Sequence, residues 1–315
     1  MDNNDRAAEA TKGLLWGIGA NFIWGLAFLV PTLLPHVSPA GITAGRYLVY
    51  GMVSVVLFIA GTRPKTASLA MWKHALLFGF AGNIGYYFFV VEGIRLAGAP
   101  IVTVIIGTLP VTVAMYGNWL HREHSFRRLA LPLVLILAGL LVVNTSEFRW
   151  HSQSGYSLHS QILGVCCAIV ALMLWTWYGV ANATFLKTHR EITSTQWATM
   201  IGVTTMVLAV AASPLFAVEL WGELVKSSRG SILMLVSGSV VLGVLVSWVG
   251  TIFWNRASSI LPVSLTGQLI VFETISGLMY VFVAYRRVPG FVELLGIAIL
   301  VVGILFGIRT VASSQ

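Results

Sequence analysis

The sequence predicts an all-α membrane protein whose ten transmembrane helices fill most of the chain. Of the 315 residues, 57% are hydrophobic and only 10% are charged, and the mean hydropathy is +0.86. A soluble domain carries about 25% charged residues, whereas a helix that spans a bilayer needs about 20 mostly apolar residues. The apolar segments have that length, and they lack the ten-residue alternation of a transmembrane β-barrel.

Five segments in the first half of the chain meet this requirement. Residues 13–34 carry no charge and are too long for the apolar region of a cleavable signal peptide. Residues 38–61 are apolar apart from Arg46, and residues 72–92 carry their charges near the two ends. Residues 96–120 begin with LAGAPIVTVIIGTLPV, and residues 128–144 contain ILAGLLVV.

Five further segments follow in the second half. Residues 160–183 contain GVCCAIVALMLWT, and residues 193–214 and 231–254 carry no charge. Residues 258–281 contain a single acidic residue near their middle, and residues 290–309 contain ILVVGILFG. Each segment is apolar on all sides, which is typical of a helix surrounded by lipid and other helices.

The distribution of Lys and Arg predicts that both termini are cytoplasmic. Of the 19 Lys and Arg residues, Arg46 lies within a span, six lie opposite the termini, and the other 12 lie on the side of the termini. Positive residues collect in cytoplasmic loops. The net charge of +8 then favours contact with anionic lipid. The six residues on the opposite side are Arg95, Arg149, Lys226, Arg229, Arg286 and Arg287.

The second half of the chain echoes the first. An offset of 151 residues places Trp24 on Trp175, and an offset of 162 places Tyr86 on Trp248. Because five helices cross the membrane an odd number of times, the second set would run in the opposite direction. The sequence therefore predicts an inverted-topology repeat, with substrate bound near the midplane between the halves.

This repeat divides the chain into five predicted parts. We expect a cytoplasmic tail, a first five-helix repeat, an external linker, a second five-helix repeat and a C-terminal tail. Their ranges are 1–12, 13–145, 146–160, 161–309 and 310–315.

Two five-helix halves with these motifs resemble the drug/metabolite transporter superfamily, in its EamA-type branch. The likeness rests on the repeat openings that end in Trp24 and Trp175, on Arg46 within TAGRYLVYG, and on the small residues and Leu-Pro of 96–111. It implies a carrier of the bacterial inner membrane, and the chain looks most like the YddG-type exporters of aromatic amino acids. The sequence departs from the family after the fourth helix, where HREH stands at 121–124 instead of a cleanly placed acidic residue.

Polar and aromatic residues form stripes on four of the predicted helices. Polar groups in lipid cost free energy unless they face the bundle interior or water, so we expect these stripes to line a central cavity. Large flat side chains suit a ligand with an apolar or aromatic body and attract ammonium groups. The candidate substrate-binding residues are Asn21, Trp24, Asn83, Tyr86, Trp175, Tyr178, Trp248 and Gln268, with Asn182 on the same helix as Trp175.

Each stripe also has a structural interpretation. The four mid-helix aromatics that would ring the cavity, namely Trp24, Tyr86, Trp175 and Trp248, can also serve packing alone. Each Asn can form a helix–helix hydrogen bond instead of contacting a ligand.

Two charged residues lie inside predicted spans and are candidates for coupling. Arg46 and Glu273 each need a partner or water, because a lone charge in the membrane is expensive. The two can pair with each other, Glu273 can carry a proton, or Arg46 can be structural. The only aspartates are Asp2 and Asp5, outside the spans. The sequence therefore favours facilitated transport or weak proton coupling through Glu273.

Other classes of function find no support in the sequence. It lacks paired membrane aspartates, an H-E-x-x-H zinc motif and a carbonyl filter sequence, and no soluble domain remains to bind nucleic acid. We therefore expect no enzyme activity, catalytic residue, metal or cofactor. The partners are a small-molecule substrate and membrane lipids, with possible proton coupling.

These observations predict an inner-membrane secondary transporter that exports small amphiphilic metabolites by alternating access. Aromatic or hydrophobic amino acids are the best match to the aromatic stripes. The alternatives are a multidrug or other metabolite carrier of the same fold, and a polytopic membrane protein without transport activity.

Overall fold

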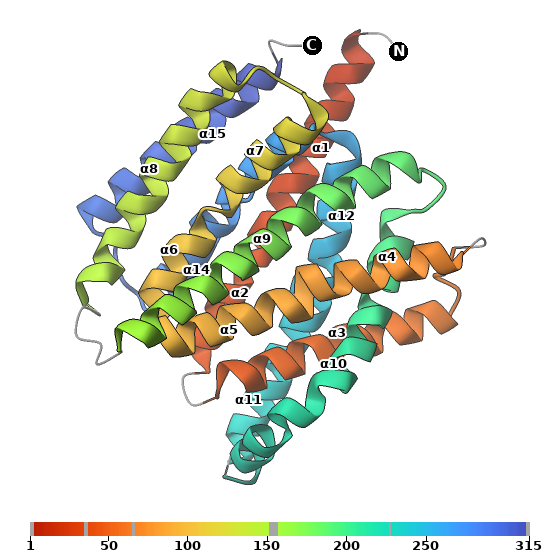
Figure 1. The fold of residues 1–315 in the computed structure, drawn as a ribbon, viewed down its shortest axis with the longest axis vertical. Coiled ribbons are helices and arrows are strands. Elements are labelled where there is room, and N and C mark those ends of the chain that lie inside the picture. The colour runs from red at the N-terminus through yellow and green to blue at the C-terminus, as the bar shows by residue number, and fades with distance from the viewer. Residues whose placement is uncertain (1–2, 35–36, 65–66, 151–156, 227, 313–315) are drawn as a thin grey trace.

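The computed structural model describes residues 3–34, 37–64, 67–150, 157–226 and 228–312. Regular structure in these ranges is helical throughout, and ten segments are long and apolar enough to cross a membrane. The prediction of ten spanning helices is confirmed. Helix α1 (Asn3–Trp24) begins, and helix α15 (Phe291–Ala312) ends, on one side of the bundle (Figure 1). We call this side the terminal end.

The first five spans include several interrupted helices. The first span joins α1 to α2 (Leu26–Leu33), and the second is α3 (Pro39–Ile59). The third span consists of α4 (Leu69–Gly79), the π-helical segment η1 (Phe80–Ile84) and α5 (Gly85–Ala97). The fourth consists of α6 (Ala99–Gly107) and α7 (Leu109–His121), and the fifth is α8 (Phe126–Trp150).

The last five spans contain two interrupted helices, the eighth and the ninth. The sixth and seventh are α9 (Leu158–Thr188) and α10 (Ser194–Lys226), and α10 continues well beyond the predicted end at residue 214. The eighth span consists of α11 (Arg229–Val240), the π-helical segment η2 (Val241–Val249) and α12 (Gly250–Ile260). The ninth consists of α13 (Val263–Leu269) and α14 (Val271–Ala284), and the tenth is α15.

The predicted linker between the halves is described only in part. Residues 151–156 of the 146–160 linker lie outside the described residues, as do residues 1–2 and 313–315 of the predicted tails. The described parts are helical on both sides, because α8 runs to Trp150 and α9 begins at Leu158.

Irregularities recur at matching places in the two halves. The third and eighth spans each contain a π-helical segment, η1 and η2. The fourth and ninth spans are each interrupted, one between Gly107 and Leu109 and the other at Ile270. Isolated π segments are frequent at functional sites, and broken helices are typical of transporter binding sites. An internal repeat predicts such matches, although the repeat itself stays a prediction.

Helices from the two halves pack closely along their lengths. The main pairs are α3 with α10, α7 with α13, and α8 with α15, and also α1 with α12 and α5 with α9; α8 and α15 run side by side in Figure 1. Glycines permit this approach. A Cβ on Gly164 of α9 would lie 2.5 Å from the Ala97 Cβ of α5, and a Cβ on Gly139 of α8 would lie 2.7 Å from the Leu300 Cγ of α15. Small residues are the usual contact points of membrane helices.

Serine residues cap four of the helices. The hydroxyl groups of Ser38, Ser68, Ser157 and Ser228 each accept a hydrogen bond from the backbone N–H three residues later, at the starts of α3, α4, α9 and α11. Such caps satisfy N–H groups that the first turn leaves unpaired, so these residues define where the helices begin.

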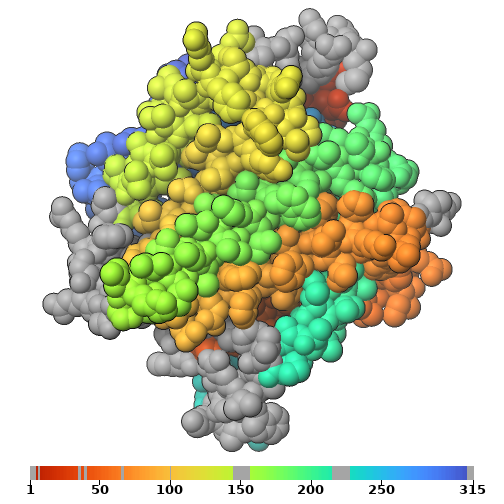
Figure 2. Space-filling model, viewed as in Figure 1, coloured from red at the N-terminus to blue at the C-terminus, as the bar shows by residue number. Residues whose placement is uncertain are grey.

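Helix α9 is central to the side of the molecule shown in Figure 2. It packs against α5 on one side and against α6 and α7 on the other. Its buried side chains join the largest apolar core cluster, which also includes residues of α1, α4, α10 and α12. The predicted aromatic stripes of the first and sixth spans therefore meet where α1, α9 and α12 approach one another.

Candidate functional site

A cluster of four aromatic side chains lies at the meeting point of α1, α9 and α12. Trp24, Trp175 and Tyr178 are at most 9% exposed, and Trp254 is 1% exposed. The ring centroids of Trp24 and Trp175 are 5.9 Å apart, those of Trp24 and Trp254 are 5.2 Å apart, and those of Trp175 and Tyr178 are 5.8 Å apart. Three of the predicted aromatics thus come together, in edge-on or tilted arrangements that aromatic pairs prefer.

Trp254 is a cluster member that lies outside the predicted stripes. The helical stripe of the eighth span is counted from Trp248 with a period of 3.6 residues, but η2 is π-helical up to Val249. A π-helix has a wider turn, with i→i+5 hydrogen bonds, so residues on either side of it do not keep the α-helical register. Counted from Trp248 in steps of three or four residues, the stripe passes through Thr251 and Asn255 and leaves out Trp254.

A hydrogen bond fixes the indole of Trp24 against η2. The Trp24 Nε1–H donates to the carbonyl oxygen of Val246 at 3.0 Å. This contact requires a glycine beneath the ring, because a Cβ on Gly250 would lie 2.5 Å from Trp24 Nε1. Trp24 therefore connects the two halves of the chain through a backbone group of the π segment.

Trp248 and Tyr86 lie outside this cluster. Trp248 is half-buried, and its Nε1–H donates to the Thr199 hydroxyl at 3.2 Å. Among the described residues it makes no ring contact with Trp24 or Trp175. Tyr86 is also half-buried and lies within electrostatic range of Glu273. The predicted ring of four aromatics is therefore divided between a buried cluster and two more accessible side chains.

The asparagine of α9 belongs to a polar network that joins helices. The Asn182 Oδ1 accepts a hydrogen bond from the Trp197 Nε1–H at 2.8 Å, and the Asn182 Nδ2 donates to the Asn255 Oδ1 at 2.9 Å. Trp197 also stacks on Phe185 at 4.1 Å. All four side chains are buried, so the helix–helix interpretation applies to Asn182. The network therefore joins α9, α10 and α12.

The remaining candidate amides are placed differently. Asn21 and Gln268 are fully buried, and each donates to a backbone carbonyl four residues earlier in its own helix. The side-chain oxygen of each has no hydrogen-bond partner in the described structure. Gln268 packs on Gly307 of α15, away from the aromatic cluster. Asn83 is half-buried and donates to the Thr205 hydroxyl at 3.1 Å.

Arg46 and Glu273 are half-buried charges on α3 and α14. The Arg46 Nε–H donates to the hydroxyl of Ser247 at 2.8 Å, and Ser247 is 2% exposed. The charges of Arg46 and Glu273 interact with each other, but the described structure contains no ion pair between them. The guanidinium and the carboxyl group are thus not paired with each other.

These charges lie next to the anchors of the aromatic cluster. Arg46 contacts Ser247, and Trp24 contacts the adjacent Val246. One turn after Glu273, the hydroxyl of Ser276 donates to the backbone oxygen of Asn21 on α1 at 3.1 Å. The two charges and the indole of Trp24 are therefore held by neighbouring residues, which makes this region the candidate binding site.

Glu123, the acidic residue of the HREH segment at 121–124, lies at the terminal end. Its carboxylate oxygens accept hydrogen bonds from the backbone N–H groups of Val263 and Ser264, at 2.6 and 2.8 Å. The acidic residue after the fourth span thus caps α13 of the other half, and a carboxylate at a helix N-terminus is favourable.

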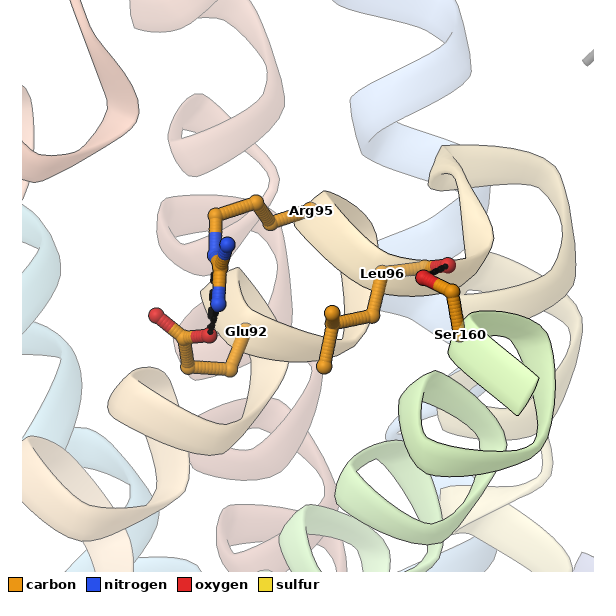
Figure 3. Close-up of polar contacts among 4 residues, drawn as sticks. All are labelled: Glu92, Arg95, Leu96 and Ser160. Carbon is orange, nitrogen blue, oxygen red and sulfur yellow. Dashed lines mark hydrogen bonds and ion pairs between the residues drawn. The ribbon is translucent and has the colours of Figure 1, made fainter. Parts of the chain in front are cut away.

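Two polar contacts lie at the opposite end of α5 and α9. The Ser160 hydroxyl donates to the Leu96 carbonyl at 2.8 Å, and Glu92 pairs with Arg95 at 2.6 Å (Figure 3). The Arg95 side chain is 66% exposed, and exposed ion pairs contribute little to stability. In the described structure, the Ser160 hydrogen bond therefore links α9 to α5 at this end.

The chain is similar to one family of transporters and to several known proteins. The model of the EamA-like transporter family matches residues 11–145. The inner membrane protein YtfF of Escherichia coli is 32% identical over 95% of both chains. An Arabidopsis thaliana chloroplastic WAT1-related protein, At3g02690, is 25% identical over 90% of this chain and 66% of its own. A protein from Synechocystis described as an uncharacterized transporter, sll0355, is 23% identical over 64% of each chain.

A solved structure has the same fold. One crystal structure superposes on this chain with a TM-score of 0.75 and 19% sequence identity, and the match covers 97% of this chain and 99% of the other. At this identity the match concerns the fold alone.

Proposed function

Because the chain belongs to the EamA-like transporter family, we propose that it exports small zwitterionic molecules with an apolar or aromatic body, of which aromatic amino acids are the best match. The chain is an integral inner-membrane protein with ten candidate spans. A small-molecule substrate follows from the family, whereas the class of substrate is our proposal.

The observation that carries the proposal is the separation of Arg46 from Glu273. A guanidinium and a carboxylate that are not paired with each other can hold the carboxylate and the ammonium group of one zwitterion. Unpaired charges in a membrane protein are expensive, and a zwitterion compensates both at once. A cationic drug or an anionic nucleotide sugar would leave one charge uncompensated, which disfavours the two main alternative cargoes.

The aromatic cluster supports an apolar or aromatic side chain on the substrate. Trp24 is held next to the residue that Arg46 contacts, so a substrate bound to the guanidinium would place its side chain toward the indoles. Aromatic pairs in edge-on geometry contribute about 0.5–1.5 kcal/mol beyond simple burial. An amino acid with a large flat side chain would gain most from this arrangement.

The transport cycle that we propose opens and closes the two ends in turn. In this cycle, the Asn182–Trp197–Asn255 network and the Glu123 cap on α13 would hold the terminal end closed. Release of these contacts, with closure at the opposite end, would expose the site to the other side of the membrane. Rocking of inverted repeats about a midplane site is the usual form of such a cycle.

The test is counterflow in proteoliposomes that contain the purified protein. We expect saturable uptake of labelled phenylalanine or tryptophan, competed by unlabelled amino acid. Arg46→Gln should reduce this uptake strongly, while Arg286→Gln, outside the spans, should leave it unchanged. Absence of counterflow for every amino acid in a panel, with saturable uptake of a cationic drug instead, would refute the zwitterion proposal.

Proton coupling is a second proposal and rests on Glu273. It is the one acidic residue near the middle of a spanning segment in the described structure, and a membrane carboxyl group is a common proton carrier. If coupling occurs, a pH gradient should change the rate of amino-acid counterflow, and Glu273→Gln should abolish that change. A gradient effect that persists in Glu273→Gln would contradict this role.

A further inference from the structure

A surface pocket lies at the terminal end, where the fourth span ends and the fifth begins. Its volume is about 540 Å³, and Trp119, Arg122 and Phe126 contribute to its lining. The fourth span ends at His121 and the fifth begins at Phe126. The pocket therefore lies at the level where the hydrocarbon of the membrane meets the headgroups.

The loop that forms the pocket is fixed by the protein itself. Asn118, 1% exposed, accepts a hydrogen bond from the backbone N–H of His124 and donates one to its carbonyl oxygen, at 2.8 and 2.9 Å. Glu123 is held by the N-terminus of α13, and Arg122 has a left-handed backbone with φ 50°. The pocket is thus a built feature rather than a gap beside a loose loop.

The side chains around the pocket combine apolar surface with positive charge. Trp119 is 65% exposed and Phe126 is 50% exposed, and aromatic residues at this depth are typical of the membrane interface. Arg122 makes no ion pair within the described part of the chain. Arg127 and Arg128 follow Phe126 directly and are exposed.

We propose that this pocket binds an anionic phospholipid, with the phosphate of the headgroup at Arg122 and an acyl chain along Trp119 and Phe126. In the orientation predicted from Lys and Arg, the pocket faces the inner leaflet, whose anionic lipids attract basic residues next to spans. A free phosphate ion would use the positive charge but leave the exposed aromatic surfaces uncovered. The proposal does not depend on which substrate the protein carries.

The opposite end of the bundle provides a matched comparison. Arg286, which follows the ninth span as Arg122 follows the fourth, also has a left-handed backbone, with φ 51°. The next residue, Arg287, is paired with Glu293 at 2.5 Å, and this carboxylate reduces the positive charge there. The two ends thus share local backbone geometry but differ in charge.

The test is lipid retention by the purified full-length protein, measured by native mass spectrometry during titration with phosphatidylglycerol or phosphatidylcholine. We expect specific retention of phosphatidylglycerol. Arg122→Gln should weaken it about fivefold, the effect of about 1 kcal/mol per basic residue near the membrane surface. Arg122→Lys should restore most of it, and Arg286→Gln should have no effect.

Three results would overturn the proposal. One is equal retention of the zwitterionic and anionic lipids, and another is equal weakening by Arg122→Gln and Arg286→Gln. The third is displacement of the bound lipid by millimolar inorganic phosphate or glycerophosphate, because this would identify a site for a free anion. Unchanged binding after Trp119→Ser would refute the acyl-chain contact, while the thermal unfolding midpoint reports whether each variant is folded.

Discussion

Replacement of Gly250 by alanine should disturb the contact that joins Trp24 to the π segment. The added Cβ would lie 2.5 Å from Trp24 Nε1 and 2.8 Å from its Cδ1, where an ordinary contact begins at 3.4 Å. The indole must therefore shift by nearly 1 Å and loses good geometry to the Val246 carbonyl. Overpacking costs about 1–3 kcal/mol, and a buried indole N–H that loses its acceptor costs about 1–3 kcal/mol. The helix propensity of alanine returns about 1 kcal/mol.

We therefore expect a net destabilisation of about 1–3 kcal/mol for Gly250→Ala, since relaxation of the ring shares the two costs. The assay is thermal unfolding in detergent, combined with counterflow. Gly230→Ala is the matched control, because its Cβ would meet only the Ser228 hydroxyl at 3.8 Å. Combined with Trp24→Phe, the cost of Gly250→Ala should shrink, because contacting residues are not additive. Equal midpoints and equal transport for the two alanine variants would refute this account of Trp24.

Three further perturbations test other parts of the structure. Trp197→Phe removes the donor to Asn182 and keeps an aromatic side chain, so it should lower stability by about 1–2 kcal/mol. If the network holds the terminal end closed, a buried reporter thiol near that end should also be modified faster, and unchanged reactivity would contradict a closing role. Glu123→Gln removes a charge-assisted cap and should lower the stability measured by thermal unfolding by about 1 kcal/mol. Glu191→Gln, in an exposed loop, should leave the stability unchanged, and equal effects of the two variants would contradict the cap. In a background that lacks Cys166 and Cys167, the two cysteines of the chain, Ser228→Cys should react with an impermeant thiol reagent added outside whole cells. Reaction only after lysis would reverse the predicted orientation.

The number and type of spanning segments followed directly from the sequence. Lipid requires long helices with satisfied backbone groups, so composition and length were sufficient. The ends of the helices were harder to predict. Helix α10 continues past Pro214 to Lys226, because a proline removes only one hydrogen bond and a helix can continue around it when its neighbours support it.

The candidate site was predictable only where the helices are regular. Trp24, Trp175 and Tyr178 lie on α-helical segments, and the structure brings them together. Trp254 follows a π segment, and no residue pattern predicts where such a segment lies. The orientation of Trp254 could therefore not be predicted by counting helical turns from Trp248. The choice between ligand and helix contact for Asn182 also depended on Trp197, a residue on another helix whose proximity only the folded chain reveals.

The role of Glu123 was equally hidden. Its partners are backbone N–H groups more than a hundred residues away in the other half, and a backbone partner leaves no mark on the sequence.

The central claim is that Arg46 and Glu273 recognise the two charges of a zwitterion. The most direct measurement compares the inhibition of phenylalanine counterflow by phenylalanine, by phenethylamine, which lacks the carboxylate, and by 3-phenylpropionate, which lacks the amine. We predict that phenylalanine inhibits at least tenfold better than either analogue. Arg46→Gln should remove its advantage over phenethylamine, and Glu273→Gln its advantage over 3-phenylpropionate. Equal inhibition by all three compounds, or the same preference in both variants, would contradict the claim.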